Sequence, residues 1–563
     1  MQTPRLLTWL SLLALAPAAL AQEVPAQQQA AIAVATRTIR PEAIRAHMRF
    51  LSDSLLEGRA PDSRGYQVAA RYVAAELEAM GLRPAGPGNT WFQPVPLRKA
   101  VVDPAKSSMT LIADSPGPHP ADQALVDGRD YVFPGDVVHA QYTLEGPVAF
   151  VGFGVTAPEE NYDDYAGLDV RGKIVLTLYG APAAFESTLR AFYSDDVEKT
   201  RNALAHGAIA MIDTLLPEDW QREPWEWSVP QFRMGSTNWL DPAGTPHSAI
   251  GTLARLNRSG AEMLFAGAPR SLEEAFAAAR SGQHQAFALP WQGRIHTVST
   301  HTTYQSPNVI GKLVGSDPAL RDQYVVYTAH VDHLGTCPPI AGDAICHGAL
   351  DNASGVATLL EIARAYTHLQ QPPRRSVLFL FVTGEEMGLL GSDYFLQVPT
   401  VPLQQLVANI NIDEAPGLLF AMKDVVALGA EHSSIGKAVL RAAHELGYTL
   451  SPDPMPEEAD FIRSDQYSFV QQGVPALYLS DGVAAADPAV DGLALEKKWM
   501  GTRYHTPLDN IDQPLDYASG ARAATLNFLV GYELGQSNDP PLWNPGNYFG
   551  IRFGQHRQAE PAK

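Results

Sequence analysis

Side chains of the kinds that bind metal ions follow three apolar segments of this chain. Each segment is rich in the β-branched and aromatic residues that favour buried strands: residues 324–329, 376–382 and 406–412. His330 directly follows the first segment, the pair Glu385–Glu386 comes just after the second, and Asp413 follows the third. Ligands of an open α/β sheet bind beyond the carboxyl ends of its strands. The spacing therefore predicts that these side chains meet at one edge of a sheet.

Two further residues extend this candidate site. Asp351 precedes a segment with helical periodicity, and His505 comes much later, in a Tyr-His-Thr-Pro sequence. Taken alone, each candidate has an ordinary structural explanation, such as a helix N-cap for Asp351. Together, two histidines and three carboxylates offer the nitrogen and oxygen donors that suit zinc. Five such ligands can hold two metal ions about 3.5–4 Å apart when one carboxylate bridges them.

The pair Glu385–Glu386 supplies one carboxylate more than the metals need. Two zinc ions would lower the pKa of a water molecule and polarise a carbonyl group, while the free glutamate would take a proton from the water and pass it to a leaving amine. Asp332 is spaced to accept a hydrogen bond from the second ring nitrogen of His330, as carboxylates beside metal-binding histidines do. These parts are complete for the hydrolysis of an amide bond.

The composition argues against several kinds of partner. The 563 residues include 41 Lys and Arg against 61 Asp and Glu, a net charge of −20. Nucleic acid and anionic membranes attract basic surfaces, so neither is expected to bind. Residues 1–21 carry one Arg, an apolar run and an Ala-Leu-Ala cleavage site, which is typical of a secretory signal peptide. No later stretch approaches the ~20 apolar residues that cross a bilayer, so we expect bacterial export to the periplasm or the medium, with no membrane span.

The chain contains two cysteines, Cys337 and Cys346. In an oxidising compartment they predict a disulfide that pins the loop between His330 and Asp351. The alternative, a metal site, is disfavoured because two thiols alone do not complete one.

The length of the chain has room for two or three domains. From residue 309 to about 535 apolar strand-like runs alternate with helical patterns, which predicts an α/β fold with a doubly wound, mostly parallel sheet. Residues 108–290 contain short β-type runs without a ligand cluster and predict a separate β-rich domain. Four tryptophans lie close together there, and both local packing and an aromatic flap over a substrate cleft explain them: Trp220, Trp225, Trp227 and Trp239.

Six sequence motifs resemble those of the M28 family of zinc peptidases, whose members include bacterial aminopeptidases. In the family's order they are AHVDHLG, GALDNASG, TGEEMGLLGS, NINIDE, RSDQYSF and YHTPLDN. The resemblance covers roughly residues 309–535, and GRAPDSRGY is similar to the family's opening segment. Residues 145–212 resemble a protease-associated (PA) domain, which this family commonly carries as an insertion. The resemblance implies a zinc-exopeptidase-like fold with an inserted β-rich PA domain.

The resemblance also implies the distribution of the ligands between two zinc ions. His330 and Asp413 would bind one ion, Glu386 and His505 would bind the other, and Asp351 would bridge both.

Five other residues take catalytic or substrate-binding roles from the same resemblance. Glu385 would be the general base and acid, and Asp332 would orient the histidine two residues before it. Tyr504 matches a tyrosine that hydrogen-bonds the oxyanion in some members. Arg463 and Asp465 match a segment beside the site and are candidates for binding the peptide substrate.

The resulting division of the chain has five parts. They are a signal peptide over residues 1–21, an N-terminal segment of the peptidase domain over 22–107, the PA domain over 108–290, the zinc peptidase domain over 291–535 and a C-terminal tail over 536–563. The sequence does not indicate the oligomeric state.

The preferred function is a secreted or periplasmic dizinc aminopeptidase, because carboxylates outnumber cations around the motifs and a free α-amine needs carboxylates. A carboxypeptidase of the glutamate-carboxypeptidase kind stays open because Arg463 could hold a C-terminal carboxylate. Glutaminyl cyclase, which uses one zinc on this scaffold, and a non-catalytic binding protein are further alternatives. The complete set of five ligands disfavours both.

Overall fold

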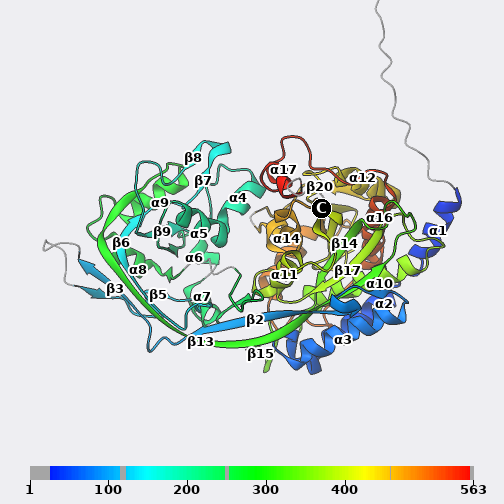
Figure 1. Ribbon diagram of the computed structural model, residues 1–563, viewed down its shortest axis with the longest axis horizontal. Helices are drawn as coiled ribbons and strands as arrows, with labels where there is room; N and C mark the ends of the chain where they lie inside the picture. The colour runs from blue at the N-terminus through cyan, green and yellow to red at the C-terminus, as the bar shows by residue number, and fades with distance from the viewer. Residues whose placement is uncertain (1–25, 114–121, 223, 248–252, 457, 558–563) are drawn as a thin grey trace, which may run out of the picture.

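The computed structural model describes residues 26–113, 122–222, 224–247, 253–456 and 458–557, which form two lobes (Figure 1). The larger lobe consists of residues 26–102 and 299–557, and the smaller lobe of residues 103–298. The predicted signal peptide lies outside the described residues. Within the described ranges, no helix has both the length and the apolar character needed to cross a membrane.

A mostly parallel sheet forms the centre of the larger lobe and confirms the expected mixed α/β architecture. Its four central strands are parallel and lie in the order β17 (Ser376–Val382), β14 (Tyr324–His330), β18 (Leu406–Asn411) and β21 (Ala476–Asp481). Antiparallel strands flank this centre. β13 (Phe287–Leu313) pairs with β17, β2 (Phe92–Val102) pairs with β13, and β19 (Asp424–Leu428) pairs with β21. The short strand β20 (Thr449–Ser451) pairs with β19.

Helices cover both faces of this sheet because alternate side chains of its strands point to opposite sides. Tyr327 and Phe379 pack in one hydrophobic cluster, whereas Val326 and Leu378 pack in another. The first face is covered by α2 (Pro41–Leu51), α10 (Gly355–Thr367), α12 (Ile435–Leu446) and α16 (Tyr517–Gln536). The second is covered by α11 (Leu390–Gln397) and α14 (Gln466–Gln471).

The smaller lobe has a sheet of short strands and a hydrophobic cluster that continues into the larger lobe. Its parallel strands are β6 (Gln141–Phe150), β9 (Ile174–Leu178), β10 (Ala210–Thr214) and β12 (Arg255–Leu256). Helices α5 (Asp196–Ala205), α8 (Arg258–Phe265) and α9 (Leu272–Arg280) pack around this sheet. Its assignment as a PA domain, and the boundaries given above, stay predictions.

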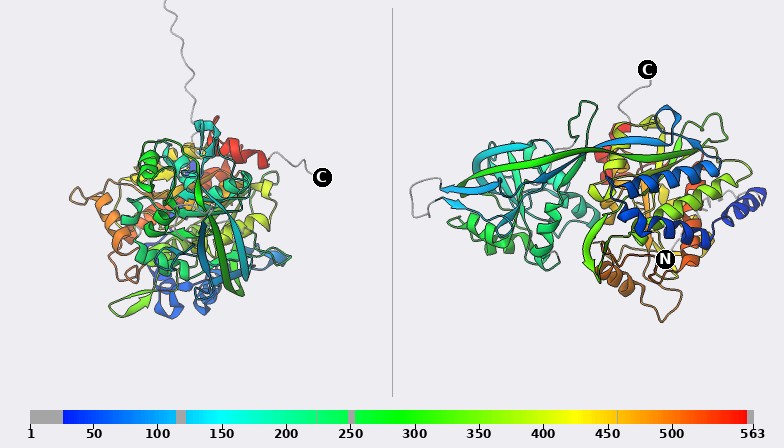
Figure 2. Two further views of the ribbon diagram at one scale, coloured as in Figure 1. Left: turned by 90° about the vertical axis from the view of Figure 1, so that its left-hand side faces the viewer. Right: turned by 90° about the horizontal axis from the view of Figure 1, so that it is seen from below.

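A single long strand joins the two lobes. Residues 287–298 of β13 pair with β6 in the smaller lobe, and residues 299–309 pair with β2, which continues into the larger sheet. The right-hand view of Figure 2, which is seen from below, shows β2 and β13 running from one lobe to the other.

Three of the four neighbouring tryptophans make local packing contacts or hydrogen bonds. Trp220 packs against Phe276, with ring centroids 6.0 Å apart, and the indole of Trp225 donates a hydrogen bond to the carbonyl of Gly128. Trp239 is 2 % exposed and donates to Oδ2 of Asp393 in α11, at 2.8 Å. The side chain of Trp227 lies outside the described part of the chain. Packing within the smaller lobe therefore explains Trp220 and Trp225, whereas Trp239 reaches α11 of the larger lobe.

Candidate active site

Strands β14 and β18 bring two of the predicted ligands together. β14 ends at His330, and Asp413 follows the end of β18 by two residues. Nε2 of His330 lies 3.0 Å from Oδ1 of Asp413, and the histidine is 1 % exposed. The other carboxylate oxygen of Asp413 accepts a hydrogen bond from the hydroxyl of Ser464 at 2.7 Å. Adjacent parallel strands thus place a nitrogen and an oxygen donor side by side.

Asp351 lies between the two predicted histidine ligands. Its Oδ1 is 3.3 Å from Nε2 of His330, and its Oδ2 is 3.1 Å from Nε2 of His505. Oε2 of Glu386 is also 3.2 Å from Nε2 of His505. One ligand atom from each of His330, Asp351 and Glu386 can be chosen so that all three lie within 4.8 Å of one another. A carboxylate whose two oxygens face different histidines has the arrangement expected of a bridging ligand.

The N-cap explanation for Asp351 is wrong, because Ser354 holds the N-cap position of the helix and the side chain of Asn352 accepts from its first N–H group. α10 begins at Gly355, whose N–H donates to Oδ1 of Asn352 at 2.8 Å. Asp351 precedes the helix in a segment with irregular dihedral angles. Its backbone is held by Asp509, whose carboxylate accepts hydrogen bonds from the N–H groups of Leu350, at 2.9 Å, and of Asp351, at 3.1 Å. Asp509 frees the side chain of Asp351 for the site, and the sequence analysis did not identify it.

Asp332 contacts the turn that carries the glutamate pair. Its carboxylate oxygens are 3.3 Å from the N–H of Glu385 and 3.4 Å from the N–H of Glu386. Nδ1 of His330 is 3.9 Å from the Asp332 carboxylate and 3.2 Å from the Asp332 backbone carbonyl. In this structure the backbone of Asp332 is thus closer to His330 than its side chain is. Glu385 approaches His330 to 3.9 Å and remains partly accessible.

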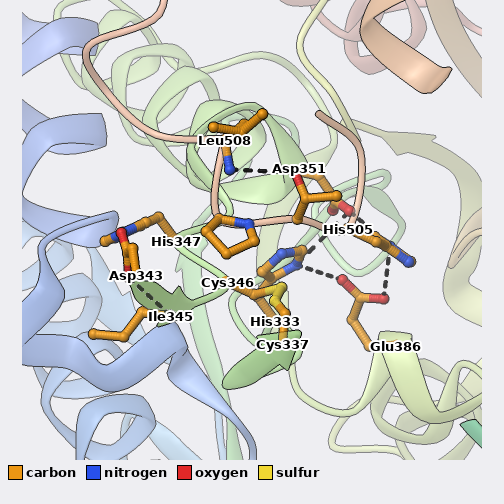
Figure 3. The surroundings of a disulfide bond; sticks show 12 residues. His333, Cys337, Asp343, Ile345, Cys346, His347, Asp351, Glu386, His505 and Leu508 are labelled. Atoms are coloured by element: carbon orange, nitrogen blue, oxygen red, sulfur yellow. Dashed lines mark hydrogen bonds and ion pairs between the residues drawn. A yellow bond between two sulfur atoms is a disulfide. The ribbon is translucent and has the colours of Figure 1, made fainter. Parts of the chain in front are cut away.

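His333 is a residue of the site that the sequence analysis did not identify. Its Nδ1 lies 2.6 Å from Oε1 of Glu386 and 3.7 Å from Oδ2 of Asp351 (Figure 3). The side chain is completely buried. The only signal in the sequence was the second histidine of His-Val-Asp-His, which carries no spacing typical of a ligand.

The remaining predicted residues lie around this cluster. The ring of Tyr504 stacks on that of His505, with centroids 3.8 Å apart. Arg463 has a side chain that is 56 % exposed and donates to the carbonyl of Glu458, whereas Asp465 is completely buried. The disulfide Cys337–Cys346 closes a hairpin beside His333, with a Cα separation of 5.6 Å (Figure 3).

The carboxyl groups of the candidate site differ in the direction in which their pKa values are shifted. Burial, followed by the nearby acidic groups, raises the pKa of Glu385 well above its usual range, and burial raises that of Asp332 to about 7. Burial also opposes ionisation of Asp351 and Glu386, but the neighbouring imidazoles outweigh it. They hold the pKa of Asp351 well below its ordinary value and lower that of Glu386 to about 2. The predicted ligands Asp351 and Glu386 thus favour the ionised form, and the predicted base Glu385 retains a proton more readily.

The donor set fits divalent zinc. Its predicted members are imidazole nitrogens and carboxylate oxygens, the ligands of zinc sites in hydrolases. Nε2 of His505 makes no hydrogen bond of acceptable geometry, although carboxylate oxygens of Asp351 and Glu386 lie within 3.2 Å. A ligand nitrogen that faces two carboxylates without such a hydrogen bond is the arrangement expected beside a central cation. His330, Asp351, Glu386, Asp413 and His505 are the residues that would hold the metal ions.

The cluster of candidate ligands lies within a segment that matches a known protein family. Residues 308–530 match peptidase family M28. The chain is 38 % identical over 106 residues to a probable zinc metalloprotease of Pyrenophora teres f. teres, covering 19 % of this chain and 22 % of that protein. It is 29 % identical over 192 residues to the probable leucine aminopeptidase 2 of Aspergillus fumigatus, covering 33 % of this chain and 35 % of that protein. The matches thus span about a fifth to a third of these relatives.

An aminopeptidase from Aneurinibacillus sp. strain AM-1 has 18 % sequence identity and a TM-score of 0.49, with 89 % of this chain and 95 % of that chain covered.

Proposed function

We propose, from the match of residues 308–530 to peptidase family M28, that the protein is a dizinc aminopeptidase that removes N-terminal residues from peptides in the periplasm or outside the cell. The observation that carries the proposal is the position of Asp351. Its two carboxylate oxygens lie 3.3 and 3.1 Å from nitrogens of two different histidines, His330 and His505. This supports a centre of two metal ions with a shared carboxylate.

Zinc bound between these residues would supply a Lewis acid for the scissile carbonyl and lower the pKa of water. Glu385 is the general base and acid in the proposal. It takes a proton from the attacking water and delivers it to the nitrogen of the leaving amine. Its position supports this role, because it lies beside His330 without contacting it closely, and its raised pKa suits a group that carries a proton during part of the cycle. Tyr504, fixed against His505 by ring stacking, is the proposed hydrogen-bond donor to the oxyanion.

The preference for a free amine rests on the charges around the site. Asp413, Glu414 and Asp460 lie close enough together for their charges to interact. Carboxylates favour a protonated amine, whereas a C-terminal carboxylate is best held by a bidentate Arg. Arg463 is the candidate for binding a C-terminal carboxylate, because its guanidinium is partly exposed. The test therefore includes the carboxypeptidase alternative.

The test uses paired substrates and a metal measurement. We expect gently purified protein to contain close to two zinc ions per chain and to cleave leucine p-nitroanilide. N-acetylation of that substrate should abolish turnover, and amidation of the C-terminus of a dipeptide should be tolerated. Cleavage of the acetylated substrate together with refusal of the amide would make the protein a carboxypeptidase. A metal content that stays near zero after zinc is supplied would contradict the proposed zinc-dependent mechanism.

The smaller lobe is proposed to be the PA domain. Its hydrogen bond from Trp239 to Asp393 reaches α11, which begins four residues after Glu386. This contact supports a role in shaping the surroundings of the catalytic turn.

A further inference from the structure

We infer that His333 is a positioning residue that fixes the orientation of Glu386 and so sets the affinity of one of the two proposed metal positions. This inference rests on the proposed dizinc function. His333 is none of the predicted ligands, and its ring nevertheless lies closer to the Glu386 carboxylate than the predicted ligand His505 does.

The two oxygens of Glu386 face different imidazoles. Oε1 lies 2.6 Å from Nδ1 of His333, and Oε2 lies 3.2 Å from Nε2 of His505. An ionised carboxylate can only accept hydrogen bonds, so Nδ1 of His333 carries the proton. This hydrogen bond occupies Oε1 and leaves Oε2 facing the proposed ligand His505. Hydrogen bonds to a metal-binding side chain of this kind typically change metal affinity by about 10–100-fold.

The ring of His333 has little freedom to move. It is completely buried, and its backbone N–H donates to the carbonyl of Arg59 at 3.3 Å. A Cβ atom on Gly348 would lie only 2.6 Å from Cγ of His333, so the opposing backbone packs directly against the imidazole. The guanidinium of Arg59 donates to the carbonyls of Val331, at 2.8 Å, and Gly348, at 2.9 Å, and so holds the chain on both sides of the ring. A ring fixed in this way can impose its direction on a partner carboxylate.

Asp332 and His333 act on the same turn by different contacts. The carboxylate of Asp332 accepts from the backbone N–H groups of Glu385 and Glu386, whereas His333 contacts the side chain of Glu386. Adjacent residues after β14 thus hold the backbone and the side chain that follow β17. His333 contributes the contact that distinguishes Glu386, a proposed ligand, from Glu385, the proposed base.

The experiment compares His333→Ala and His333→Asn with a matched control, His347→Ala. The amide nitrogen of Asn can stand in for Nδ1 and preserve the hydrogen bond. His347 is a buried histidine of the same loop between His330 and Asp351, and its ring contacts Ser52 and Asp343 but no predicted ligand. Zinc and Co²⁺ affinities are measured by competition with a chelator without substrate, together with the absorption spectrum of the Co²⁺ protein.

We expect His333→Ala to lower the affinity for metal at one position about 10–100-fold and to leave the affinity at the other position close to that of the wild type. His333→Asn should recover most of that loss, and His347→Ala should leave both affinities unchanged. Wild-type affinities for both metals in His333→Ala would overturn the inference. So would a Co²⁺ spectrum of His333→Asn that shows the loss of a nitrogen ligand, because His333 would then bind metal directly. Normal metal binding without peptide hydrolysis would contradict the proposed function and leave this inference standing.

Discussion

Glu385 and Glu386 are neighbours in the chain with different environments. Glu386 contacts His333 and His505, and its pKa is lowered to about 2, whereas Glu385 lies 3.9 Å from His330 and its pKa is raised well above the ordinary value. Burial acts on both, and the imidazoles beside Glu386 make the difference. Environments that separate the pKa values of two carboxyl groups in this way suit a ligand and a proton carrier.

We predict that Glu385→Gln retains both metal ions and loses most of its kcat. General acid–base catalysis is worth about 10²–10⁴-fold, and Glu385 takes part in both proton transfers of the proposal. Elemental analysis and steady-state kinetics on leucine p-nitroanilide check this. Glu386→Gln is the matched comparison and should lose metal as well as activity. A near-normal kcat in Glu385→Gln would show that this carboxylate is only a structural part of the turn.

Among the individual residues of the site, the sequence predicted best those whose side chains lie at the end of a strand or directly after it. His330 and Asp413 come from adjacent strands and lie 3.0 Å apart. The contacts of His333 with Glu386 and of Asp509 with Leu350 join residues 53 and 159 positions apart. No local pattern encodes such contacts, because they depend on how loops pack after the sheet has formed.

The hairpin formed by β15 (Thr336–Ile340) and β16 (Asp343–Ile345) lies between two predicted ligands, His330 and Asp351. The disulfide Cys337–Cys346 closes its base. The N–H of Cys346 also donates to the carbonyl of Gly335, whose own N–H donates to Gly58 near the start of the larger lobe. Hydrogen bonds thus fix the base of the hairpin to Gly335, just before its first strand, and through Gly335 to Gly58, which is distant in the sequence.

We expect replacement of both cysteines by Ser to lower the free energy of unfolding by about 2–3 kcal/mol through the entropy of the closed loop. Denaturant unfolding of oxidised wild type and the double variant measures the difference. The single variants serve as controls, because each removes the same bond. Two thiols titrated in the denatured, unreduced protein would contradict the presence of the disulfide.

The elements around the site follow from sequence patterns to different extents. The strand expected over residues 376–382 is β17, because a fully buried parallel strand has a continuous apolar run. The 27-residue strand β13 was not expected as one element, because its two halves pair with different lobes and contain polar stretches. Its continuity is decided by tertiary pairing rather than by local preference.

At the scale of the whole molecule, the C-terminal segment packs between the lobes. Phe549 of α17 (Tyr548–Phe553) is 2 % exposed and has its ring 5.6 Å from that of Phe461 in the larger lobe and 6.5 Å from that of Phe192 in the smaller lobe. Arg552 forms an ion pair with Glu198 of the smaller lobe. The tail predicted for residues 536–563 thus contributes to the contact between lobes.

We predict that Phe549→Ala lowers the free energy of unfolding by about 3–5 kcal/mol, because it leaves a cavity among aromatic side chains. Ile551→Ala is the control in the same helix, since Ile551 is 62 % exposed and should change stability little. Chemical denaturation of both variants provides the comparison. A loss in Phe549→Ala no larger than in Ile551→Ala would show that α17 does not stabilise the assembled lobes.

Strand β13 also bears on how the molecule loses its structure. One hydrophobic cluster lies within the larger lobe, and a second fills the smaller lobe and continues into the larger lobe at Phe461, Tyr467 and Phe549. Unfolding of the smaller lobe alone would also remove the partners of residues 287–298 and expose Trp291, while the rest of the strand stayed hydrogen-bonded in the larger sheet. Broken pairing at one end of a continuous strand leaves unsatisfied backbone groups at the junction. The two cores are therefore coupled into one cooperative unit, in which neither lobe retains its native stability once the other has melted.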